Sequence, residues 1–190
     1  VSLAAGGAII TWRDFRNNTD WDIYAQLINA SGVAQWTSNG VAICTATNDQ
    51  TNPQIASDGS GGAYIVWLDG RNGSLFDIYG QRINSIGWIK WTDQGELLAS
   101  ELEACTTVKI VNDGSHGAIF AGQFGISINS YGLALNGEVQ WTALNIVFER
   151  EPDKFTLVSD GSGGAIVAAH TYLSAGGFIY GYVEVQKITP

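Results

Sequence analysis

The chain has 190 residues, of which 45% are hydrophobic and only 14% are charged. Its 9 basic and 18 acidic residues give a net charge of −9, which argues against nucleic-acid phosphates and anionic membrane surfaces as partners. No run of about 18 apolar residues occurs, so we expect no membrane span. The chain begins at Val1 without a methionine or a basic leader, and we expect a processed product or a piece of a longer protein.

A glycine-rich segment recurs along the chain and defines internal repeats. It reads SDGSGGA at 57–63 and 159–165, NDGSHGA at 112–118, and SLAAGGA at 2–8. Two other markers keep nearly the same spacing. The tripeptide DIY begins at Asp22 and Asp77, and a tryptophan returns as Trp36, Trp91 and Trp141. We therefore divide the chain into four repeats, at about 1–52, 53–106, 107–154 and 155–190.

Each repeat is predicted to consist of short strands. Repeat one carries the apolar run AIITW at 8–12. In repeat two, strands are expected at 53–56, 63–67, 76–84 and 88–91, with Asp-Gly and Gly-containing turns between them. In repeat four they are expected at 155–159, 164–171 and 178–188. No segment shows a capped 3.6-residue period, so we expect almost no helix.

The motifs of repeat two resemble those of a known repeat family. Q-x-x-P-x-I-x-x-D-G-x-G-G-A starts at Gln50, W-x-D-x-R-N ends at Asn72, DIYGQ ends at Gln81, and G-x-x-x-W ends at Trp91. This order resembles the tandem β-propeller repeats of secreted and cell-surface bacterial and archaeal proteins, with sialidase-like propellers as more distant relatives. The resemblance covers nearly the whole chain, although repeats three and four match only in part.

The resemblance implies an all-β propeller of four blade-like repeats, each a four-stranded antiparallel meander, with incomplete terminal blades. In that family the P-x-I strand is innermost and the tryptophan strand is outermost. The loops 14–21, 45–53, 69–76 and 100–107 should then gather on one face. The sialidase comparison fails in detail, because the Gly32–Trp36 spacing does not match an Asp-box and no separate arginine triad is present.

Two repeat-equivalent pairs are the first candidates for ligand binding. Asp14 and Arg16 return as Asp69 and Arg71, flanking the same tight connection. Arginine suits bidentate contacts with a sugar or a carboxylate, but an Asp–Arg pair that holds its own loop explains the repetition better. Trp21, whose counterpart is Phe76, and Trp88 are the candidates for exposed aromatic residues, whereas the repeat-equivalent tryptophans should pack in the core.

Calcium is the only cofactor that the sequence suggests, and no cofactor is the favoured interpretation. Asp22 and Asp77 recur before Ile-Tyr, and Asp20 lies close to the first of them. Closely spaced carboxylates provide the hard oxygen ligands that calcium prefers, but the dense Asp-x-Asp-x-Asp-Gly pattern is missing. Asp58, Asp113 and Asp160 are expected to serve as turn residues instead.

Catalysis has no support from sequence motifs. No Ser-His-Asp order, HExxH motif or phosphate-binding glycine loop is present, and His116 and His170 have no recurring catalytic neighbour. Cys44 and Cys105 occupy different repeat positions and lack metal spacing, which leaves a disulfide and two buried free thiols equally open. If the chain were instead a glycoside-hydrolase-like enzyme, Asp14, Asp69 and Glu149 would be its first candidate carboxylates.

These observations favour a non-catalytic extracellular or cell-surface scaffold or recognition module that binds a glycan or a protein at the loop face. A sialidase-like enzyme and a structural fragment of a longer surface repeat protein are the alternatives. Because repeat four has no counterpart of the segments that end at Trp36 and Trp91, we expect an unpaired strand edge along 178–188. Another chain, or further sequence, is expected to cover that edge and so produce self-association.

Overall fold

The computed structural model describes residues 1–4, 6–73, 75–101, 103–147, 152–175 and 178–189. Every regular element in these ranges is a β-strand. The strands are β1 (Ala8–Asp14), β2 (Asp22–Ile28), β3 (Val41–Cys44), β4 (Gln50–Ser57), β5 (Ala63–Asp69), β6 (Asp77–Ile83), β7 (Glu96–Ala99), β8 (Cys105–Asn112), β9 (Ala118–Phe124), β10 (Ser127–Leu133), β11 (Val139–Val147), β12 (Pro152–Ser159), β13 (Ala165–Ala175) and β14 (Phe178–Ile188). The predictions of an all-β class and of almost no helix are confirmed for the described part of the chain.

The strands form four antiparallel meanders, one for each repeat. We name them sheet A (β1–β3), sheet B (β4–β7), sheet C (β8–β11) and sheet D (β12–β14). The repeats also keep one pairing register, because Ala63 pairs with Ile83 in sheet B and the same position pairs in the other sheets as Ala8↔Ile28, Ala118↔Leu133 and Ala165↔Ile188. The three-stranded terminal sheets agree with the expected incomplete ends.

Aspartates shape the glycine-rich turn that opens each apolar strand. The Asp58 Oδ1 atom accepts hydrogen bonds of 2.8 Å from the backbone N–H groups of both Ser60 and Gly62. Asp113 and Asp160 do the same in sheets C and D. The turn role predicted for these three residues is confirmed. His116, which stands where repeat two has Gly61, has a left-handed φ of 73°.

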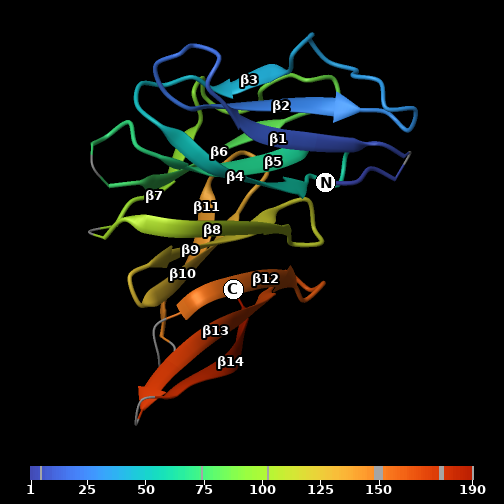
Figure 1. The fold of residues 1–190 in the computed structure, drawn as a ribbon. Coiled ribbons are helices and arrows are strands. Elements are labelled where there is room, and N and C mark those ends of the chain that lie inside the picture. Colours follow the sequence, from blue (N-terminus) through green and yellow to red (C-terminus); the bar gives the residue numbers. More distant parts are fainter. Residues whose placement is uncertain (5, 74, 102, 148–151, 176–177, 190) are drawn as a thin grey trace.

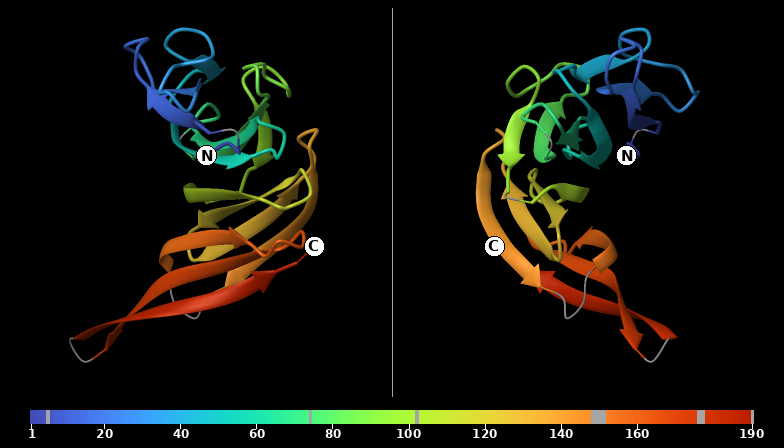
Figure 2. Two further views of the ribbon diagram at one scale, coloured as in Figure 1. Left: turned by 90° about the vertical axis from the view of Figure 1, so that its right-hand side faces the viewer. Right: turned by 60° about the vertical axis from the view of Figure 1, so that its left-hand side comes forward.

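The four sheets follow one another in chain order, with sheets A and D at opposite ends of the molecule (Figures 1 and 2). Strand β4 lies beside β1 and β8, and β8 lies beside β12. Buried apolar side chains form one cluster at each of the three junctions. Every residue of β5 is buried, because sheets cover both of its faces. Each sheet is open and the described parts of sheets A and D do not meet, so a propeller blade arrangement stays a proposal.

The outermost strand is not where the family resemblance puts it. The segment 88–91 was expected to be the last strand of repeat two, but only Ile89 forms an isolated bridge there, with Ile83. The fourth strand is β7, which begins at Glu96. Repeat one behaves in the same way, with β3 lying beyond Trp36. Tryptophan lies in the outer strand only in sheet C, where Trp141 is part of β11.

The described residues include no helix with the length and apolar character needed to cross a lipid bilayer.

Candidate functional site

Trp67, Asp69 and Arg71 form a buried polar cluster in sheet B, with a spacing that repeat one also has. The Asp69 carboxylate accepts a hydrogen bond of 2.7 Å from the Trp67 indole N–H and two from Arg71, of 2.9 Å from Nε and 2.6 Å from Nη2. The Arg71 guanidinium also lies 3.9 Å from the centre of the Tyr79 ring. Because the strand places alternate residues on one face, Trp67 and Asp69 face the same side and meet the arginine of the loop.

Sheet A contains a second copy of this cluster. The Trp12 indole and the Arg16 guanidinium both bind Asp14, and Arg16 lies 3.8 Å from the centre of the Tyr24 ring. The hydrogen bonds from Arg16 hold the pKa of Asp14 well below its usual range. Asp14 therefore stays ionised at neutral pH and has no proton to give to a substrate.

Each arginine also closes the outer connection of its own sheet. The Nη2 group of Arg16 donates to the Asn39 carbonyl at 2.9 Å, and that of Arg71 donates to the Gln94 carbonyl at 2.8 Å. The prediction that Asp14 contacts Arg16 and that Asp69 contacts Arg71 is confirmed. Among the described residues, no hydrogen bond or ion pair joins one Asp–Arg pair to the other. Both pairs are thus structural clasps, and the Arg71 copy also contacts the Cys44 thiol of sheet A.

The loops that were expected to share a face are joined by hydrogen bonds. The backbone N–H of Trp21 donates to Asp49 Oδ1, and the N–H of Gly70 donates to the Asp49 carbonyl. The N–H of Cys105 donates to the Phe76 carbonyl in the same manner. Contacts therefore run from loop 14–21 through the connection at Asp49 to loop 69–76 and on to the start of β8.

An aromatic pair stands out on this loop face. The rings of Phe15 and Trp21 lie 5.0 Å apart, and the Arg13 guanidinium lies 4.3 Å from the centre of the Trp21 ring. Phe15 is 41% exposed and Trp21 is half-buried. Phe76, the repeat-two counterpart of Trp21, packs instead against the core between sheets B and C. The two residues therefore share a sequence position without sharing an environment.

The calcium candidates are bound to asparagine side chains. The Asn17 amide donates to Asp20 Oδ1 at 2.5 Å and to Asp22 Oδ2 at 3.1 Å, and the Asn72 amide donates to Asp77 Oδ2 at 2.9 Å. Asp22 is buried, and desolvation raises its pKa. Among the described residues, no three His, Cys, Asp or Glu side chains cluster closely enough to hold a metal ion. Calcium binding therefore stays a prediction.

The two cysteines are free thiols in separate environments. Cys44 lies in the outer strand of sheet A, with its Sγ 3.0 Å from Arg71 Nη2, and Cys105 begins β8. Burial raises the pKa of both thiols to about 12. Neither of them is a candidate nucleophile, because catalysis would need the thiolate.

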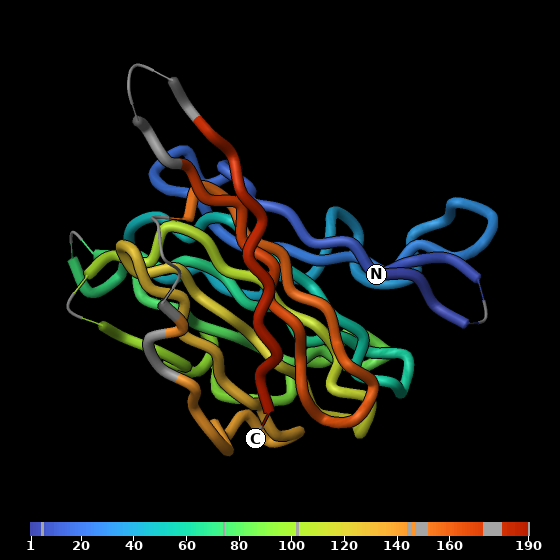
Figure 3. Tube along the Cα trace, turned by 90° about the horizontal axis from the view of Figure 1, so that it is seen from below, coloured from blue at the N-terminus to red at the C-terminus, as the bar shows by residue number. Residues whose placement is uncertain are grey.

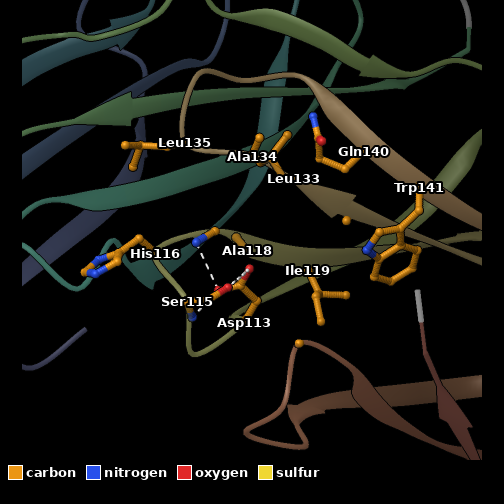
Figure 4. A pocket seen from close by; sticks show the side chains of 13 residues that line it. Asp113, Ser115, His116, Ala118, Ile119, Leu133, Ala134, Leu135, Gln140 and Trp141 are labelled. Carbon is orange, nitrogen blue, oxygen red and sulfur yellow. Dashed lines mark hydrogen bonds between the residues drawn. The ribbon is translucent and has the colours of Figure 1, made fainter.

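A hollow that the sequence did not predict lies at the opposite end of the sheets. The hollow has a volume of about 370 Å³. It is lined by His116 and Ser115 of one turn, Leu135 of the next turn, and Gln140 and Trp141 of β11 (Figure 4). The exchange of a turn glycine for His116 was the only sequence signal for it. Glu149, the third carboxylate of the enzyme alternative, lies outside the described residues.

Comparisons with protein-family models, with curated proteins and with solved structures found no match to this chain.

Proposed function

We propose that this chain is a non-catalytic, propeller-type repeat scaffold that works outside the cell or at the cell surface and binds a glycan or a protein at its loop face. The observation that carries the proposal is the internal use of the two Asp–Arg pairs. Asp14 and Asp69 each receive an indole N–H and a bidentate arginine of their own repeat. Carboxylates that are already hydrogen-bonded in this way hold their own loop and leave little capacity for acid–base work.

The binding surface of the proposal is the aromatic pair on the same loop face, formed by exposed Phe15 and half-buried Trp21. Phe15 and Trp21 offer ring surface at the point where loop 14–21 meets the connection at Asp49. Arg13, stacked over Trp21, supplies a cation beside the rings. Ring faces bind the apolar face of a sugar or an aromatic group, and a guanidinium adds hydrogen bonds to hydroxyl or carboxylate oxygens.

The test is binding of the purified chain to a glycan array and to extracellular protein extracts, with Trp21→Ala as the diagnostic variant. We expect this change to weaken binding at least about tenfold, the loss of roughly 1.4 kcal/mol of aromatic contact. Trp88→Ala is the matched control, because Trp88 is 67% exposed in a turn of sheet B. Equal loss in both variants, or no ligand at all, would contradict the proposed binding surface.

A hydrolysis assay on sialosides and glycan polymers separates the scaffold from the enzyme alternative. We expect no sugar to be released. The scaffold assignment would be overturned by turnover that disappears in Asp14→Ala while the variant keeps the far-ultraviolet circular dichroism spectrum of a folded β protein.

A further inference from the structure

Sheet D leaves uncovered, at one end of the molecule, a face on which exposed valines lie beside Lys154 and Lys187. Val158, Val183 and Val185 are 50%, 70% and 61% exposed on the face that points away from sheet C. Figure 3, which views the molecule from below, shows the described strands of this sheet in front of the remaining chain. The other face of sheet D is covered, since Val167 and Ala169 are fully buried against sheet C.

The same position is fully buried in the other three repeats. Val183 lies five residues before Ile188, the residue that pairs with Ala165. The residues at the same distance from the equivalent pair in the other sheets are Ile23, Ile78 and Ile128. All three isoleucines are 0% exposed. They are buried because the next sheet packs over them, and Val183 is exposed because the described chain places no sheet over it.

Sheet A leaves the complementary face uncovered at the other end. Ile10, in the middle of β1, is 45% exposed. Its counterparts Ile65, Phe120 and Val167 are each 0% exposed, because the preceding sheet covers them. Sheet A has no preceding sheet among the described residues, so the face that carries Ile10 is open to solvent.

The three junctions inside the molecule pair these two positions each time. Ile23 and Ile65 belong to the cluster between sheets A and B, Ile78 and Phe120 to that between B and C, and Ile128 and Val167 to that between C and D. Val183 lies on the face of its sheet that packs on the next sheet in the other repeats, and we call this the presenting face. Ile10 lies on the face that packs on the preceding sheet in the other repeats, and we call this the receiving face. The two end faces are therefore the two halves of an interface that the chain already forms three times.

We propose that the outward face of sheet D of one molecule packs on the outward face of sheet A of a second copy, with Val183 against Ile10. This contact is face to face, unlike the addition of a strand to the edge at 178–188. It joins two different surfaces, so it is heterologous and gives either a closed ring of two or more copies or an open filament. Burial of the exposed apolar side chains on these two faces supplies its driving force.

Sedimentation velocity of the purified chain over a range of concentrations gives the first readout. We expect the average mass to rise above the 20.3 kDa of one chain as concentration increases. Val183→Glu places a charge on the presenting face, and Ile10→Glu places one on the receiving face. Each variant alone should sediment as a monomer, since every copy then lacks one half of the interface.

Mixing the two variants gives the decisive readout. The intact receiving face of Val183→Glu and the intact presenting face of Ile10→Glu can still form one junction, so the mixture should form a dimer and nothing larger. Ile86→Glu is the matched control, because Ile86 is 61% exposed in a turn of sheet B and the variant should keep the wild-type mass distribution. Far-ultraviolet spectra verify the folding, and Val183→Thr with Ile10→Thr replace any glutamate variant that unfolds.

Three results would overturn the proposal. A wild-type chain that remains a monomer at every concentration has no such interface. Association that survives Ile10→Glu but not Val183→Glu points to contacts between two sheet D faces or edges. A mixture of the two variants that remains monomeric shows that the faces of sheets A and D do not fit each other.

Discussion

The carboxylate of Asp69 holds the guanidinium of Arg71 through two hydrogen bonds, of 2.9 Å and 2.6 Å. The side chain of Asp69 is 0% exposed and that of Arg71 is 18% exposed. In repeat one the same bonds join Asp14 and Arg16, whose side chains are 15% and 39% exposed. The chain thus contains two copies of the same ion pair that differ in burial. The more buried copy, Asp69–Arg71, lies where sheet A covers sheet B.

Replacement of these two aspartates by alanine should have unequal effects on stability. Asp69→Ala leaves a largely buried guanidinium and the Trp67 indole N–H without their acceptor, which should cost about 3 kcal/mol of unfolding free energy. Asp14→Ala exposes its partners to water and should cost about 1 kcal/mol. Urea unfolding of the two variants measures the difference. Equal losses would show that sheet packing does not deepen the second clasp.

The Asp14 clasp should also be sensitive to pH. Hydrogen bonds from Arg16 lower the pKa of Asp14 in the folded state below its value in the unfolded chain, so the folded carboxyl group releases its proton more readily than the unfolded one. The stabilisation is therefore complete above the unfolded pKa and is lost as the pH falls through the folded pKa. The gap in unfolding free energy between the wild type and Asp14→Asn should be widest near neutral pH and shrink below about pH 4.

Arg16→Gln provides the control for that measurement, because it removes the cause of the shift and leaves the carboxylate in place. This variant should lose the same acid-dependent part of the stability. A gap for Asp14→Asn that stays constant from neutral to acidic pH would contradict the assigned origin of the lowered pKa.

Tryptophans that reach into the following repeat should stabilise the sheet junctions. The Trp36 indole donates to the Ser85 carbonyl at 3.2 Å, and a Cβ added at Gly87 would lie 2.9 Å from its ring. The equivalent turn of repeat one has Gly32 with nothing within 4 Å of such a Cβ. Both glycines have left-handed φ angles, 83° and 78°, so alanine costs about 1 kcal/mol at either position through backbone strain.

Gly87→Ala should therefore destabilise the chain by more than Gly32→Ala, because only the former displaces an indole. Thermal unfolding of both variants, monitored through tryptophan fluorescence, checks this expectation. If the two melting temperatures fall equally, the Trp36 contact contributes nothing to the junction between sheets A and B.

Both thiols should be protected in the native protein. Burial raises the pKa of both thiols to about 12, so very little reactive thiolate is present at pH 8. An aromatic disulfide reagent should label neither Cys44 nor Cys105 until denaturant is added, after which both should react. Rapid labelling of one thiol in the Cys44→Ser or Cys105→Ser variant would identify a site that opens locally.

Much of the repeat structure could be predicted because it depends on local signals. The repeat spacing of 55 residues came from the Asp-Gly turns, the apolar runs and the DIY marker. The strand pairing keeps this spacing, because the bridge Ser2↔Ala8 lies 55 residues before the pair Ser57↔Ala63. Contact within each Asp–Arg pair was also predicted, because two residues on a strand end and its tight turn are close in any fold. The hollow beside His116 was not predicted, since its walls come from turns of different strands.

The sequence by itself determined the period of the repeat, the strand type and the turn residues, all of which follow from interactions over a few residues. Only the tertiary structure decided which strand is outermost and which faces are covered. Ile10 and Ile65 are both isoleucines at the equivalent position of equivalent strands, and yet Ile10 is 45% exposed and Ile65 is 0% exposed. The physical reason is that burial of a sheet face depends on the neighbouring sheet, which no local pattern within the strand encodes.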